Sequence, residues 1–129
     1  MIEPASDHAL VLVVEDEFLI RMHAAEMIKE ADYEVVEATN ADDAIAILEA
    51  RRDIGVVFTD IQIAGSMDGF KLAHAVRHRW PPIHIIATSA HYRTLTEELP
   101  AGSLFLPKPY TEYAVLGALH TLTAQYGRP

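Results

Sequence analysis

Short apolar runs alternate along the chain with segments in which apolar residues recur at helical spacing. Runs rich in valine and isoleucine predict buried β-strands, whereas apolar residues three or four positions apart predict helices with one face turned inward. The alternation therefore predicts a sheet whose strands are connected by helices. The expected strands are Leu10–Val14, Glu34–Ala38, Ile54–Thr59, Ile83–Thr88 and Leu104–Leu106.

A helix is expected after each strand, which gives five helices. Asn40 can cap the second helix, with Asp43 three residues later in a near capping box, and Thr111 can cap the last. The fourth, within 91–99, is expected to be short because Pro100 and Gly102 follow it. The expected inward faces are Ile20, Ala24, Met27, Ile28 and Ala31; Ala44, Ile47 and Leu48; Phe70, Ala73 and Val76; Leu95 and Leu99; and Val115, Leu119, Leu122 and Tyr126.

Strict alternation of continuous apolar strands with helices indicates an α/β fold. The sheet would be parallel, covered on both faces and joined by right-handed crossovers. Ligands of such sheets bind beyond the carboxyl ends of the strands. Polar residues follow several of the predicted strands, so the fold would gather them at one edge. These residues are Glu15, Asp16, Asp60, Ser89 and Lys108.

This set of side chains has a definite chemistry. Carboxylates bind a hard divalent cation, and the cation in turn offsets their mutual repulsion. The ammonium group of a lysine neutralises the charge on a phosphate oxygen. Together they predict a site that binds a divalent metal ion and transfers a phosphoryl group.

Composition narrows the class of protein. A chain of 129 residues fits one domain, which we expect at 9–126 between short tails at 1–8 and 127–129. A net charge of −9 with scattered basic residues argues against direct nucleic-acid binding. The chain has no cysteine, no run long enough to span a membrane and no basic region of a secretory signal within Met1–His8. A cytoplasmic protein with no membrane attachment is therefore expected.

Five short motifs follow one another along the chain, most of them at the end of a predicted strand. They are Val11–Glu17 (VLVVEDE), Phe58–Gln62 (FTDIQ), Met67–Gly69 (MDG), Thr88–Ala90 (TSA) and Lys108–Tyr110 (KPY). In this order they resemble the response regulator receiver family of two-component signalling, over nearly the whole chain. The resemblance implies a flavodoxin-like (βα)5 three-layer sandwich with strand order 2-1-3-4-5, an order taken from the family rather than from the pattern.

The resemblance also implies a role for each candidate residue. Asp60 would be the phospho-acceptor, receiving a phosphoryl group from a phosphohistidine on a histidine kinase or a histidine phosphotransfer protein. Mg²⁺ or Mn²⁺ would be held by Glu15, Asp16, Asp60 and the backbone carbonyl of Gln62. Lys108 would pair first with the acceptor carboxylate and later with a phosphoryl oxygen.

Further residues would form the switch. Ser89 matches the hydroxyl that binds the phosphoryl group, and Phe105 matches the aromatic residue that follows its movement. Alternatively, Phe105 is a strand residue that packs on the last helix. The peptide bond before Pro109 would be cis, and Gln62 and His91 occupy positions that tune phosphoryl lifetime. The stretch before Lys108 is short for the family, so the fourth helix would be truncated.

Several functions stay open at this point. The first is a stand-alone receiver that switches binding to an unknown downstream protein, as a monomer or a phosphorylation-dependent homodimer, without enzymatic activity beyond its own phosphorylation and dephosphorylation. The second is a phosphorylation-independent adaptor. The third is a phosphohydrolase, which usually needs a second aspartate where this chain has Gln62. Glu17 is expected only to stabilise the first helix, and His74 and His78 are not expected to bind a transition metal.

Overall fold

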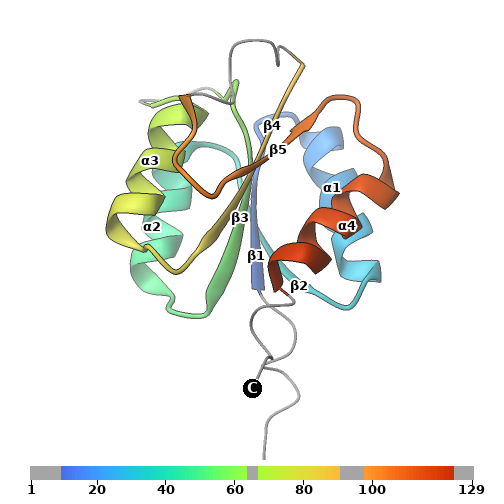
Figure 1. Cartoon of the computed structure of the whole chain (residues 1–129), viewed down its shortest axis with the longest axis horizontal. Helices are drawn as coiled ribbons and strands as arrows, with labels where there is room; N and C mark the ends of the chain where they lie inside the picture. Colours follow the sequence, from blue (N-terminus) through green and yellow to red (C-terminus); the bar gives the residue numbers. More distant parts are fainter. Residues whose placement is uncertain (1–9, 64–66, 91–97, 124–129) are drawn as a thin grey trace, which may run out of the picture.

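Parallel strands form the centre of the computed structural model, which describes residues 10–63, 67–90 and 98–123. In these residues they make one sheet in the order β2-β1-β3-β4-β5, which confirms the predicted α/β fold and strand order (Figure 1). All neighbouring strands are parallel, so their carboxyl ends share one edge. The strands are β1 Leu10–Val14, β2 Glu34–Ala38, β3 Ile54–Asp60, β4 His84–Ser89 and β5 Leu104–Pro107.

Three strands run one residue further toward this edge than the sequence analysis predicts. β3 includes Asp60, β4 includes Ser89 and β5 includes Pro107. The ladder continues to these residues, since Asp60 pairs with Thr88 and Ser89 pairs with Pro107. A polar side chain does not end a strand whose backbone still has a partner. Two candidate site residues therefore belong to the rigid sheet and not to loops.

Two of the described helices cover each face of the sheet, which gives the predicted three layers (Figure 1). The helix expected within 91–99 falls on residues that the structure does not describe, apart from Glu98 and Leu99. None of the helices in the described residues is both long and apolar enough to cross a membrane. On one face lie α1 Phe18–Glu30 and α4 Glu112–Thr123, and on the other lie α2 Ala41–Ala50 and α3 Gly69–Arg79.

Both predicted helix caps are confirmed. The side chain of Asn40 accepts a hydrogen bond from Asp43 N at 2.8 Å, and the hydroxyl of Thr111 does the same for α4. Asp68 caps α3 in this way too. Glu17 occupies the N-cap position of α1 but makes no side-chain hydrogen bond there. α1 therefore starts without the side-chain cap that α2, α3 and α4 have.

The core is divided by the sheet, because alternate residues of each buried strand face opposite helix layers. Ala25 and Leu72 are buried although the sequence analysis did not place them inward, and Leu95 and Tyr126 lie outside the described residues. Most other predictions are confirmed. Buried are Ala24, Met27, Ile28, Ala44, Leu48, Ala73, Val76, Val115, Leu119 and Leu122; half-buried are Ile20, Ala31, Ile47, Phe70 and Leu99.

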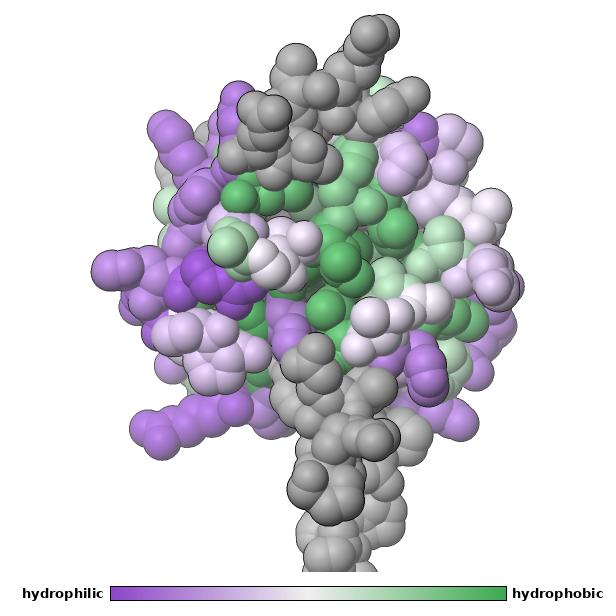
Figure 2. All heavy atoms as spheres, in the orientation of Figure 1, coloured by the Kyte–Doolittle hydropathy of each residue, from purple (hydrophilic) through white to green (hydrophobic). Residues whose placement is uncertain are grey.

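The edge strand β5 divides its side chains between the two layers. Leu104 and Leu106 pack with the core under α1 and α4. Phe105 packs against the buried Ile61 and Ala87 on the α3 side, as Phe70 and Leu99 do. The alternative prediction that Phe105 packs on the last helix is therefore wrong, because neighbouring strand residues face opposite sides. Figure 2 shows hydrophobic residues gathered along the middle of the face where Figure 1 places β5, with hydrophilic residues around them.

Candidate functional site

The carboxyl ends of β1, β3 and β5 bring two carboxylates and one ammonium group together. Glu15 follows β1, Asp60 is the last residue of β3, and Lys108 follows β5. Lys108 Nζ lies 3.1 Å from Asp60 Oδ2 and 3.2 Å from Glu15 Oε1. Each of the two carboxylate residues is only 5% exposed. The structure thus joins three residues that the sequence analysis placed at one edge.

A third carboxylate makes this cluster a candidate metal site. One oxygen each from Glu15, Asp16 and Asp60 lies within 4.8 Å of the others, and Asp16 is exposed to solvent. Carboxylate oxygens are hard ligands, and Mg²⁺ usually takes one or two of them while it keeps several waters. The cluster can therefore hold a divalent cation that enters from the side of Asp16. The backbone carbonyl of Gln62 as a further ligand stays a prediction.

Negative charge at the site is only partly compensated. Burial raises the pKa of Asp60, and the nearby Asp16 adds to this, although Lys108 and the Gln62 amide act in the opposite direction. Burial also raises the pKa of Glu15, and the charge of Asp60 adds to it. Burial alone would lower the pKa of Lys108, but attraction to both carboxylates outweighs it and the pKa is raised. The lysine stays protonated, and the buried carboxylates would gain from a further cation.

Gln62 connects the acceptor candidate with the switch candidate. Its backbone N–H donates to Asp60 Oδ1 at 3.2 Å, and its side-chain Oε1 accepts a hydrogen bond from Ser89 Oγ at 3.0 Å. Ser89 is fully buried at the end of β4. The two oxygens of Asp60 therefore have different partners, because Oδ2 faces Lys108 and Oδ1 faces the Gln62 amide.

The turn after β3 is packed against the start of α3. Gly69 N donates to Ile61 O at 2.8 Å. A Cβ atom built on Gly69 would lie 2.5 Å from both Asp60 O and Ile61 Cα. That distance is far below van der Waals contact, so only glycine fits without a shift. The Gly69 position of the MDG motif thus has a physical role, which is to let α3 approach the end of β3.

The segment after β5 fixes the position of the lysine. The Lys108–Pro109 peptide bond is cis, as the resemblance implied. Lys108 N donates to Ser89 O at 2.9 Å, so the lysine backbone is tied to the end of β4. The Tyr110 ring packs edge-on against Phe58, with ring centroids 5.7 Å apart. Burial raises the pKa of Tyr110, so its hydroxyl stays protonated beside the site.

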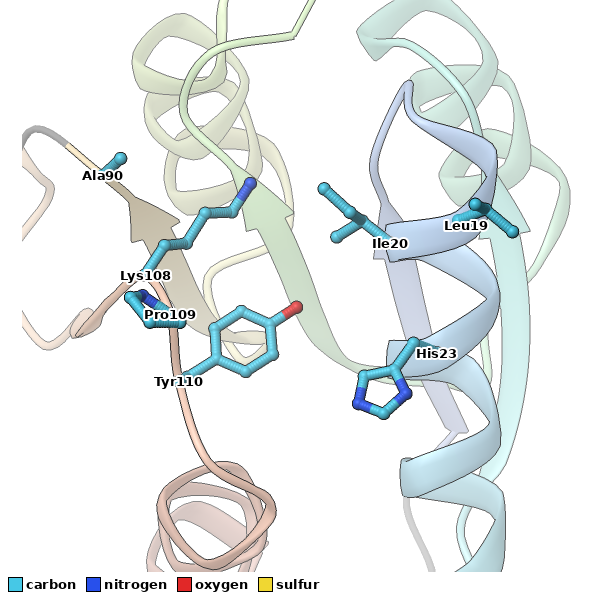
Figure 3. Close-up of a pocket in the computed structure, with 7 residues that line it drawn as sticks. All are labelled: Leu19, Ile20, His23, Ala90, Lys108, Pro109 and Tyr110. Carbon is cyan, nitrogen blue, oxygen red and sulfur yellow. The ribbon is translucent and has the colours of Figure 1, made fainter.

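A pocket of about 530 Å³ opens beside Lys108, between α1 and the segment after β5. Figure 3 shows Lys108 and Tyr110 on one wall, pointing toward Ile20 and His23 of α1. At the start of α1, Phe18 and Leu19 are 62% and 69% exposed. Neither was among the predicted site residues. The signal for them is the row of three apolar residues, Phe18 to Ile20, at the start of a helix that can bury only one face.

The remaining candidates lie outside the carboxylate cluster. Phe105 packs against Ile61 and Ala87, on the α3 side of the sheet. His74 Nε2 lies 2.6 Å from Glu98 O, so a backbone carbonyl occupies that ring nitrogen. None of the described histidines belongs to a group of potential metal ligands. His91 lies outside the described residues.

The sequence profile of the response regulator receiver domain matches residues 11–120 of this chain. Sensor kinase CckA of Brucella abortus (strain 2308) is 32% identical over 117 residues, which cover 85% of this chain and 12% of that protein. Transcriptional regulatory protein PdtaR of Mycobacterium tuberculosis (strain ATCC 25618 / H37Rv) is 29% identical over 119 residues, or 90% of this chain and 57% of that protein. This chain thus spans only part of the length of these curated relatives.

Solved structures share the fold. A response regulator receiver protein from Sinorhizobium medicae WSM419 superposes with a TM-score of 0.84 at 24% identity, covering 91% of this chain and 95% of that one. Chemotaxis response regulator CheY4 of Vibrio cholerae superposes with a TM-score of 0.80 at 26% identity, covering 89% of this chain and 98% of that one. The arrangement of strands and helices described above is therefore that of receiver domains.

Proposed function

Because this chain belongs to the response regulator receiver family, we propose that it accepts a phosphoryl group on Asp60 from a phosphohistidine of a partner protein. Receiver domains of this family interact with histidine kinases or histidine phosphotransfer proteins, which supply such a donor. One observation carries the proposal for this chain. The ammonium group of Lys108 lies 3.1 Å from Asp60 Oδ2, within a cluster of three carboxylates.

In the transfer, a carboxylate oxygen of Asp60 forms a bond to phosphorus. The bond between phosphorus and the donor histidine breaks, and its electron pair leaves with the imidazole. A carboxylate is a weak nucleophile, but the transition state is loose, so positioning and charge neutralisation matter more than basicity. Lys108 supplies positive charge for the phosphoryl oxygens, and the backbone N–H of Gln62 orients the carboxylate by donating to Asp60 Oδ1.

We propose Mg²⁺, or Mn²⁺ in its place, as the cofactor. Glu15, Asp16, Asp60 and the backbone carbonyl of Gln62 would hold the ion. When bound, it neutralises the carboxylates and a phosphoryl oxygen. The raised pKa values of Glu15 and Asp60 support this proposal, because they result from buried negative charge that Lys108 only partly offsets.

The exposed apolar side chains at the start of α1 favour a protein as the phosphoryl donor over a small molecule. Leu19, which is 69% exposed, lines the pocket beside Lys108, and its neighbour Phe18 is exposed at the start of the same helix. Exposed apolar side chains at the mouth of a site mark a surface that another protein covers. A partner helix that carries the phosphohistidine would bury them as it brings phosphorus to Asp60.

We infer that phosphorylation switches the binding of a downstream protein through Ser89 and Phe105. Ser89 would turn toward the phosphoryl oxygens, and Phe105, half-buried against Ile61 and Ala87, would respond. We do not assign the chain an external substrate, because Gln62 stands where an aspartyl-phosphate phosphohydrolase has its acid/base. An adaptor that works without phosphorylation is the second candidate function, and the third is the phosphohydrolase.

Intact mass spectrometry after incubation with Mg²⁺ and acetyl phosphate tests the proposal. The wild-type chain should gain the mass of one phosphoryl group, and a chelator should prevent the gain. Asp60→Asn should gain nothing. Asp53→Asn is the matched control, because Asp53 is an exposed aspartate paired with Arg51, and this variant should be labelled like the wild type.

Two outcomes would replace the proposal. Hydrolysis of many phosphate esters without a stable adduct would favour the phosphohydrolase. No adduct with any acyl phosphate or phosphoramidate donor, in a chain that is folded and binds Mg²⁺, would favour the adaptor.

A further inference from the structure

The hydroxyl of Ser89 is already engaged in this structure. Ser89 Oγ donates to Gln62 Oε1 at 3.0 Å, and Ser89 is completely buried while Gln62 is exposed. A serine hydroxyl has one hydrogen to donate. It cannot donate to the Gln62 side chain and to a phosphoryl oxygen on Asp60 at the same time. The two acceptors therefore compete for one hydrogen.

We propose that Gln62 is a positioning residue whose side chain holds Ser89 in its unphosphorylated arrangement and so sets the free-energy difference of the switch. The inference rests on the proposed function and adds a chain-specific determinant to it. Gln62 reaches Ser89 across the ends of two neighbouring strands, from the turn that follows the acceptor. Loss of its side-chain oxygen should make the switched arrangement easier to reach.

The backbones on both sides of this hydrogen bond are fixed. The Gln62 N–H is held by Asp60 Oδ1 at 3.2 Å, and Ser89 O accepts from Lys108 N at 2.9 Å. The change of partner must therefore come from rotation of the Ser89 side chain or from a shift of the residues after it. Gln62 is exposed, so its side-chain amide is hydrated once it is released from Ser89. The free energy lost is therefore close to that of one neutral hydrogen bond.

A binding equilibrium measures this competition directly. Beryllofluoride mimics a phosphoryl group on a carboxylate, and its apparent affinity for the whole chain in the presence of Mg²⁺ can be followed by amide NMR shifts. Gln62→Met keeps the side-chain length but removes the acceptor, and it should increase the affinity by about two- to twelve-fold, the value of one net hydrogen bond. Gln62→Ala should do the same. Because the measured quantity is a binding equilibrium, it does not depend on how easily water hydrolyses an aspartyl phosphate.

A double-mutant cycle separates this role from a direct effect on the mimic. Ser89→Ala should weaken beryllofluoride binding, and in that background Gln62→Met should change nothing further. Tyr33→Phe is the matched control. It removes a hydroxyl hydrogen bond of 3.1 Å to Thr123. Tyr33 directly precedes β2, at the edge of the sheet opposite to Asp60, so the variant should leave the affinity unchanged.

Three results would overturn the inference. Equal affinities of the wild type and Gln62→Met would show that the hydrogen bond does not oppose the switch. A gain that persists in the Ser89→Ala background would show that Gln62 acts on the mimic directly. Failure of the wild type itself to bind beryllofluoride would overturn the proposed function as well, which distinguishes the two failures.

Discussion

Replacing Gly69 by alanine tests how tightly the start of α3 is packed against the end of β3. The added Cβ would lie 2.5 Å from Asp60 O, 2.5 Å from Ile61 Cα and 2.9 Å from Ile61 O. All three are backbone atoms, so no side-chain rotation can relieve the contact. The φ angle of Gly69 is not positive, so the objection to alanine is steric and not conformational.

The size of the effect follows from these distances. Ordinary carbon contacts lie at about 3.5 Å or more, so the end of β3 and the start of α3 must separate by roughly 1 Å. Overpacking of this kind destabilises by about 1–3 kcal/mol. Alanine is favoured over glycine in a helix by up to about 1 kcal/mol, which offsets part of this. We expect a net loss of about 1–2 kcal/mol in the free energy of unfolding.

Gly117 provides the matched control for this substitution. It lies within α4, and a Cβ built on it meets nothing within 4 Å. Gly117→Ala should therefore stabilise the chain by about 0.5–1 kcal/mol, so the same change has opposite signs at the two positions. Urea denaturation followed by circular dichroism, with unchanged m values, measures both. If Gly69→Ala proves as stable as the wild type, the close approach of α3 to Asp60 is not real.

The site gives three further predictions. In metal-free buffer Asp60→Asn should be more stable than the wild type near neutral pH. The folded-state pKa of Asp60 is raised above 3.8, so the wild type loses stability as the pH rises from 3.8 through the folded-state pKa. The urea midpoints of the two proteins should therefore converge below pH 3.8. Mg²⁺ at ten times its Kd should raise the wild-type free energy of unfolding by about 1.4 kcal/mol, and an equal rise in Asp16→Asn would mean that the ion binds elsewhere. Lys108→Met should slow labelling by acetyl phosphate by about 100- to 1000-fold, whereas Lys71→Met, which changes an exposed lysine of α3, should not.

Much of the fold could be predicted from the sequence because the strands are buried on both faces. Every residue of β1 is buried, and such a strand needs a continuous apolar run that is visible without alignment. The strand order could not be predicted in this way. No local feature of β1 specifies that β2 and β3 lie on either side of it, and the order came from the family resemblance. Helix caps were predictable because Asn40 and Thr111 act on amides of their own helix.

The site could be predicted as a set of residues but not as a network of contacts. Lys108 and Glu15 are 93 residues apart in the sequence, so their hydrogen bond depends on how the strands assemble. The bond between Ser89 and Gln62 also joins separate elements. Periodicity carries no information on such pairs. The direction of the Phe105 side chain could have been predicted, however, because alternation along β5 requires it to face away from α4.

A crystal structure with Mg²⁺ and beryllofluoride would test most directly whether these residues form one phosphoryl-acceptor site. We expect beryllium on a carboxylate oxygen of Asp60, Lys108 Nζ against a fluorine, and the metal ion in contact with Asp16 and Asp60. Beryllofluoride on another carboxylate, or a metal ion away from Asp16, would contradict it.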